Sequence, residues 1–223
     1  VRSTYSPAVF NKKGKQWLHT GFMWGYNKTD GGDNDWGSSS TGASRFISSG
    51  PRLNILKTGE HKDATRYGIE LAFGQGPLDV QYERMWMDID GCAGDVLTGG
   101  SCTFTAAKYD FSAWSHYVTA SYFLPIGQGK KMRAYNPQKG KYGRIKATNA
   151  AMIAYRYGYQ DYNDAANNKT RGDIIDHTFT LNYFFSPYHS VQIEYYMADF
   201  DFSDNTAKND EADVLQVNWR IDF

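Results

Sequence analysis

The chain has 223 residues, with 24 basic and 24 acidic side chains and an aromatic content of 16%. A net charge of zero argues against a nucleic-acid-binding protein, which normally carries a basic surface. The mean hydropathy of −0.62 is typical of a soluble protein, and no run of the sequence approaches the roughly 20 apolar residues of a membrane-spanning helix. Neither observation excludes a β-barrel, in which only alternate residues face lipid.

Alternation of apolar and polar residues predicts an all-β fold of about nine antiparallel strands. In chain order these are 1–10, 17–26, 65–74, 78–86, 111–124, 151–160, 178–185, 191–202 and 214–223. The alternation is most regular in the last strand, where Leu215, Val217 and Trp219 alternate with polar residues. Several of these strands have the roughly 9 to 11 residues that cross a membrane, whereas soluble strands usually have about 5 to 6.

The strand 191–202 is less regular than the others. Val191, Ile193 and Tyr195 share one face, but after Ala198 the apolar residues move to the other parity. An extra residue in the strand would restore the alternation, so we expect a β-bulge near Met197 and Ala198.

The predicted connections alternate between short and long. Short ones are 11–15, 74–77 and 186–190, and long ones are 27–64, 90–110, 161–173 and 203–210. This alternation is typical of a transmembrane β-barrel with short periplasmic turns and long extracellular loops. Neighbouring strands run in opposite directions, so the first and ninth strands run the same way. If the ninth strand ends at the periplasm, the first strand therefore begins at the extracellular side. Because single-chain bacterial barrels have even strand numbers, we expect residues 1–223 to be one domain that lacks its N-terminal strands.

One long connection, 126–149, breaks the alternation, because it lies on the short-turn side. It contains seven cations and no acidic residue: Lys130, Lys131, Arg133, Lys139, Lys141, Arg144 and Lys146. Such a segment would attract anionic solutes to the inner mouth of a pore. A solvated loop or a subunit contact is an equally acceptable interpretation.

Cys92 and Cys102 are the only two cysteines, and they bracket a glycine-rich segment. We expect them to form a loop disulfide in the oxidising periplasm, with two unpaired thiols as the alternative. A zinc site is not expected there, because no histidine or further cysteine is close in the sequence.

The polar faces of the predicted strands supply candidate pore-lining residues: Arg66, Glu70, Gln81, Glu83, Arg156, Glu194, Asn218 and Arg220. The simplest interpretation is that these charges pair across strands and solvate the wall. Alternatively, Arg156 and Arg220 offer guanidinium groups, which bind phosphate well, although Glu83 and Glu194 would oppose an anion preference.

The sequence does not favour an enzyme. It has five histidines but no G-x-S-x-G motif. Ser115 and His116 are neighbours, yet adjacent residues of a strand point to opposite faces and cannot pair directly. We expect neither a cofactor nor a metal site.

Four segments carry a resemblance to a known family. These are YSPAVFNKKGKQWLHTGFMWGY, YGIELAFGQGPLDVQYERM, SYFLPIGQGKKMRAYNPQKGKYGRIK and ADVLQVNWRIDF. Their order resembles the C-terminal half of the phosphate- and pyrophosphate-selective outer-membrane porins, the porin O and P family. The resemblance implies strands eight to sixteen of a sixteen-stranded, homotrimeric, anion-preferring barrel. The family's constriction loop lies in the other half, so its phosphate-binding residues cannot be assigned here.

Together these features predict a porin of the bacterial outer membrane, surrounded by lipid, with a water-filled channel for passive diffusion of small solutes. Anions such as phosphate are the expected solutes. The first alternative is a structural or adhesive outer-membrane barrel with a plugged lumen. The second is a soluble β-sandwich that binds carbohydrate on an aromatic face.

Overall fold

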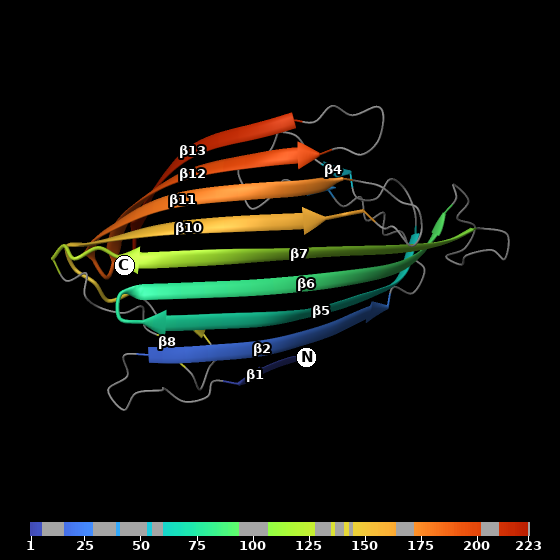
Figure 1. The fold of residues 1–223 in the computed structure, drawn as a ribbon, viewed down its shortest axis with the longest axis horizontal. Helices are drawn as coiled ribbons and strands as arrows, with labels where there is room; N and C mark the ends of the chain where they lie inside the picture. The colour runs from blue at the N-terminus through green and yellow to red at the C-terminus, as the bar shows by residue number, and fades with distance from the viewer. Residues whose placement is uncertain are drawn as a thin grey trace.

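The protein is represented by a computed structural model that describes residues 1–5, 16–28, 39–40, 53–54, 60–93, 107–127, 135–136, 141–142, 145–163, 172–201 and 210–222. Nine strands form one antiparallel sheet in the order β1-β2-β5-β6-β7-β10-β11-β12-β13. Figure 1 shows them side by side as one curved sheet, with β1 and β13 farther from the viewer than β7 and β10. The predicted all-β antiparallel fold is therefore confirmed.

The strands of the sheet are β1 (Arg2–Tyr5), β2 (Gln16–Lys28), β5 (Glu60–Gln75), β6 (Leu78–Ala93), β7 (Ala107–Phe123), β10 (Ala150–Asp161), β11 (Asp173–Ser186), β12 (His189–Asp201) and β13 (Asp210–Ile221). Four two-residue strands form two separate pairs: β3 (Ser39–Ser40) with β4 (Leu53–Asn54), and β8 (Tyr135–Asn136) with β9 (Lys141–Tyr142). The described residues include no helix long and apolar enough to span a membrane.

Several strands are longer than the alternation predicted. Both β5 and β6 have 16 residues and β7 has 17, whereas the predicted strands covered only their more apolar parts. Their additional residues include Asp88 and Asp90, which pair with the neighbouring strand although they are polar. Hydrophobic alternation marks the apolar band of a strand, but backbone pairing continues beyond that band.

The β-bulge expected near Met197 and Ala198 is wrong. The pairing of β12 with β11 runs without a shift from Asp201 to Ser190, and its pairing with β13 is continuous as well. The apolar residues change parity because Ala198 and Phe200 pack against apolar neighbours on the other face of the sheet. A change of environment, rather than an extra residue, explains the pattern.

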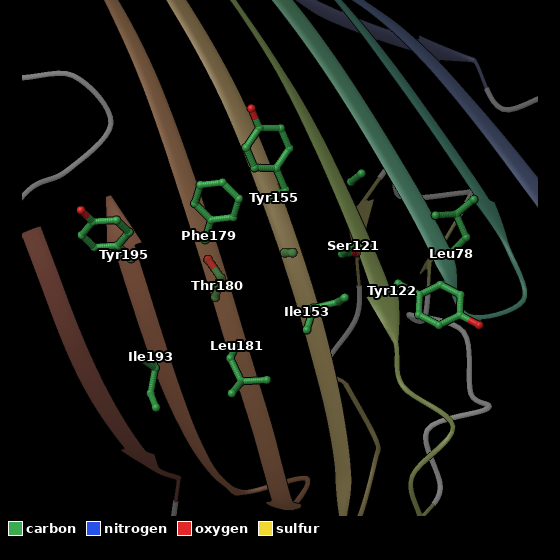
Figure 2. Close-up of a pocket in the computed structure, with 12 residues that line it drawn as sticks. Leu78, Ser121, Tyr122, Ile153, Tyr155, Phe179, Thr180, Leu181, Ile193 and Tyr195 are labelled. Carbon is green, nitrogen blue, oxygen red and sulfur yellow. The ribbon is translucent and has the colours of Figure 1, made fainter. Parts of the chain in front are cut away.

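The sheet has one exposed apolar face, which we call the outer face. Its large side chains include Phe22 and Trp24 in β2, Ile153 and Tyr155 in β10, and a row of residues in β13 that are 53–70% exposed. Figure 2 shows part of this face, with Tyr155, Phe179 and Leu181 on neighbouring strands. We call the opposite side, where glycine, polar and charged residues alternate with these side chains, the inner face.

The short connections lie at one end of the sheet. Between β5 and β6 the chain turns at Gly76 and Pro77, and Gly76 has a φ of 57°, which glycine adopts without strain. The connection between β7 and β10 lies at this same end, because Phe123 pairs with Met152. The predicted position of the basic connection 126–149 on the short-turn side therefore agrees with the topology.

Candidate functional site

The pairing of the strands puts all eight predicted pore-lining side chains on the inner face. Arg66 pairs with Gly25 and Met87, Glu70 pairs with Glu83, and Arg156 pairs with Thr119 and Thr178. Gln81, Glu194, Asn218 and Arg220 have the same parity in β6, β12 and β13. Their contact with a solute stays a prediction.

The centre of the inner face is a row of residues that crosses four strands. Glu83 of β6 pairs with Tyr117 of β7, Tyr117 with Gly158 of β10, and Gly158 with Asp176 of β11. The Tyr117 hydroxyl donates a hydrogen bond of 2.6 Å to Glu83 Oε2. Acidic side chains thus stand on both sides of a tyrosine and a glycine.

Gly158 leaves the space into which Asp176 leans. A Cβ atom at position 158 would collide with the Asp176 carboxylate, whose residue is only 1% exposed. Asp176 Oδ1 has no hydrogen-bond partner within the described residues. A buried carboxylate oxygen without a donor is costly, so a larger residue at position 158 would displace a group that already lacks one hydrogen bond.

Arg156 lies two residues from Gly158 along β10, on the same face, and contacts Tyr117. The carbon of its guanidinium is 4.2 Å from the centre of the Tyr117 ring, which is a cation–π contact. In the described part of the chain, Arg156 has no ion-pair partner, and its Nε has no hydrogen bond. Arg220 differs, because its Nη2 is 3.0 Å from Asp222 Oδ2. Arg156 therefore lacks a direct ion pair in this stretch of the wall, although its charge interacts with the buried carboxylate of Asp176.

A second polar cluster lies toward the β1 edge of the sheet. His19 Nε2 is 3.3 Å from Glu70 Oε1, and both side chains are on the inner face. Gly21 pairs with Glu70, and a Cβ at Gly21 would collide with the Glu70 side chain. Glycine again makes room for a charged neighbour on the inner face.

Short hydrogen bonds along single strands satisfy other inner-face groups. Gln81 donates to Asp79 at 2.9 Å, and Gln192 donates to Glu194 at 3.1 Å. Gln216 donates to Asn218 at 2.7 Å. These inner-face groups are thus satisfied by neighbours on the same strand, whereas the simplest interpretation of the sequence expected charges to pair across strands.

The inner face becomes apolar toward the long-loop end. Ile174, Tyr196, Ala198 and Phe200 are at most 3% exposed and pack together with Ala113. The sequence analysis did not predict this cluster, although the change of parity after Ala198 was caused by it. It also missed Tyr117 and Asp176, because a tyrosine or an aspartate on a strand does not reveal which neighbour it contacts.

Two predicted features lie mostly outside the described residues. In the basic connection, Lys130, Lys131, Arg133, Lys139 and Arg144 are outside them, whereas Lys141 belongs to β9 and Lys146 is exposed. Cys92 belongs to β6, but Cys102 is outside the described residues. The roles of the basic connection and the disulfide therefore stay predictions.

Ser115 and His116 point to opposite faces of β7, since Ser115 pairs with Met85 and His116 with Arg84. Among the described side chains, no group of three or more histidine, cysteine, aspartate or glutamate residues could hold a metal ion. The sequence model of one family, the phosphate-selective porins O and P, matches residues 4–223. No curated protein matches the chain.

Proposed function

Since the chain belongs to the phosphate-selective porin O and P family, we propose that it forms part of the wall of an outer-membrane diffusion channel. The family consists of channels rather than enzymes, and the all-β fold agrees with an outer-membrane porin. The proposed solutes are small anions, phosphate among them.

The observation that carries this proposal is the division of the sheet into two unlike faces. The outer face exposes large apolar and aromatic side chains, which would be unfavourable in water over such an area. The inner face carries the charged and amide side chains of the central strands. Hydrocarbon outside and water inside is the environment that satisfies both faces.

The edge of the outer apolar band that faces the long loops supports a membrane position. The first outer carboxylate is Asp213 in β13 and Asp88 in β6. Residues paired with Asp213 across the successive strands lead to Tyr82 in β6, which lies six residues before Asp88. The edge of the apolar band therefore shifts by six residues over five strand spacings. With about 3.3 Å per residue and about 4.8 Å between strands, the strands must tilt by about 40° for this edge to be level. Transmembrane barrels have tilts of about 35–45°.

Arg156 is the residue that we propose to attract anions. Its guanidinium is suited to bind phosphate oxygens with two hydrogen bonds. Tyr117 separates this cation from Glu83, because its ring stacks under Arg156 while its hydroxyl binds the carboxylate. The hydrogen bond from Tyr117 engages Glu83, so Asp176 is the carboxylate that shares the charge of Arg156, and a passing anion would compete with it.

Replacing Arg156 with glutamine tests this role. In planar bilayers with a salt gradient, Arg156→Gln should lower phosphate-over-potassium permeability roughly tenfold, as expected for the loss of one charge-assisted contact. The matched control is Arg220→Gln, whose charge is already compensated by Asp222 and should matter less. Unchanged permeability ratios in Arg156→Gln, or an equal loss in both variants, would contradict the assignment.

Closure of the barrel requires further strands in this proposal. The described residues form no pairing between β1 and β13, so each has one edge without a partner. Open edges are not tolerated in hydrocarbon, because their backbone groups have no water to bind. Because the chain belongs to the porin O and P family, we propose a sixteen-stranded barrel and a homotrimer. The mass of the native assembly in detergent would test the number of subunits.

A structural or adhesive barrel with a plugged lumen is the second candidate. It is favoured by the apolar inner cluster around Ile174, Tyr196 and Phe200, since a water-filled mouth does not need buried apolar residues. Single-channel recording separates the two candidates. Stable conductance steps support the diffusion channel, and their absence in correctly inserted protein supports the plugged barrel.

A further inference from the structure

Arg84 is a cation on the outer face, where most neighbours are apolar or aromatic. It pairs with His116 across β6 and β7, and the next pair toward the long-loop end is Trp86 with Trp114. Two polar side chains and two indoles therefore form a compact patch. We call Arg84, Trp86, Trp114 and His116 the outer arginine patch.

The guanidinium of Arg84 bends toward the long-loop end. Its central carbon is 4.8 Å from the centre of the Trp86 ring and 4.4 Å from that of Trp114. His116 stacks on Trp114 with ring centres 5.5 Å apart and an angle of 12° between the planes. Arginine at a membrane boundary extends its stem along the apolar surface so that its charge reaches the polar zone.

The outer arginine patch has unsatisfied nitrogen atoms. Arg84 Nε and His116 Nδ1 are both buried without a hydrogen-bond partner, and Arg84 makes no ion pair with the residues that the structure describes. A charge that faces hydrocarbon is costly and is almost always paired. An anion from outside this part of the chain would therefore lower the free energy of the patch.

The depth of the patch matches that of lipid headgroups. Along β6, Trp86 is the last outer aromatic residue, and Asp88 is the first outer carboxylate. Tryptophan marks the membrane–water interface, where lipid phosphates lie. The guanidinium is directed to this level by its contacts with Trp86 and Trp114.

An apolar groove lies on the same face, closer to the middle of the membrane. Figure 2 shows its lining, which includes Tyr122, Ile153, Phe179 and Leu181, and its volume is about 590 Å³. Ala120 belongs to the lining and is four residues from His116 along β7, about 13 Å at the usual rise per residue. A lipid acyl chain that descends from the patch would reach this groove.

We propose that the outer arginine patch binds the headgroup phosphate of an anionic membrane lipid, with one acyl chain in the apolar groove. Charge complementarity, the interfacial depth and the groove below the patch favour a lipid over a second copy of the protein. The two indole rings contact the guanidinium and hold it at the level of the headgroup. The inference rests on the proposed membrane location but not on conduction.

Lipid retention by the native assembled protein tests the proposal. The protein is reconstituted in nanodiscs of phosphatidylcholine with a minor fraction of phosphatidylglycerol, and retained lipids are counted by native mass spectrometry. Arg84→Gln should lower the affinity for phosphatidylglycerol about tenfold, and Arg84→Lys, which keeps the charge but loses the planar group, should lower it less. The matched control is Arg156→Gln, which removes the same charge from the inner face and should retain lipid like the parent.

The outcomes of this experiment separate the possibilities. Equal phosphatidylglycerol retention in the parent and Arg84→Gln would overturn the proposal. So would a smaller assembly with unchanged lipid retention, since the patch would then contact a second copy. Conductance is measured on the same samples: normal currents with lost lipid binding support a lipid site, and lost currents in every sample count against the diffusion channel instead.

Discussion

The two faces of the sheet are built from the same strands, yet they obey different rules. On the outer face, most side chains are large and apolar or aromatic, and the carboxylates of β6 and β13 lie toward its long-loop end. On the inner face, close contacts between specific partners dominate, such as Gly158 with Asp176 and Tyr117 with Glu83. The side chains of the outer face suit the surrounding medium, whereas those of the inner face suit their individual neighbours.

The largest difference between the two faces should be the stability cost of an added charge. Leu181 and Asn182 are neighbours in β11 on the outer and inner faces. Leu181→Arg should destabilise folding into lipid vesicles by about 2–4 kcal/mol, and Asn182→Arg by less than about 1 kcal/mol. Urea titration of the vesicle-inserted protein measures both values. Similar costs for the two variants would mean that the faces do not meet different media.

A methyl group on the inner face should have a smaller effect that depends on the site. Gly158→Ala would force Asp176 to move and should cost about 1–3 kcal/mol. Gly25→Ala is the matched control, because a Cβ at Gly25 has no atom within 4 Å. The same urea titration compares them, and equal stabilities would contradict the close packing described for Asp176.

Removal of one hydroxyl group should change selectivity without a change of charge. Tyr117→Phe frees Glu83, which can then pair with Arg156. Anion-over-cation permeability should fall roughly 1.4- to fivefold, since an exposed ion pair contributes about 0.2–1 kcal/mol. Adding Glu83→Gln should restore it. Tyr195→Phe removes an outer-face hydrogen bond to Asp213 and should leave permeability unchanged.

The basic connection should give the smallest effect. Reversing Lys130, Lys131, Arg133 and Arg144 to glutamate should lower anion-over-cation permeability less than about twofold at physiological salt, where the Debye length is about 8 Å. The effect should grow at lower salt. Reversal potentials that stay the same at every salt concentration would remove this segment from the mechanism.

The sequence predicted the strands because alternation depends on the medium that each face meets. All eight candidate pore-lining residues therefore have the predicted parity, including Arg156 and Glu83. Alternation could not distinguish the apolar inner cluster from a bulge, because both change the parity of β12 after Ala198. A single sequence contains no information about which distant strand supplies the neighbour of an apolar residue.

Contacts between pairs of site residues could not be predicted either, because a single sequence does not show which strands are neighbours. Tyr117 and Glu83 are 34 residues apart, and only the register of β6 with β7 brings them together. Arg84 lies on the outer face, where its charge contradicts the alternation. Its contacts with Trp86 and Trp114 explain how the strand accommodates it.

The proposed channel wall requires that one face of the sheet meets hydrocarbon and the other meets water. Spin labels placed one at a time at Thr178, Phe179, Thr180 and Leu181 test it most directly in the vesicle-inserted protein. Oxygen, which dissolves in hydrocarbon, should reach Phe179 and Leu181 best, while a water-soluble nickel chelate should reach Thr178 and Thr180 best. If collisions with both reagents are low at all four positions, the sheet is covered on both sides and the channel wall is refuted.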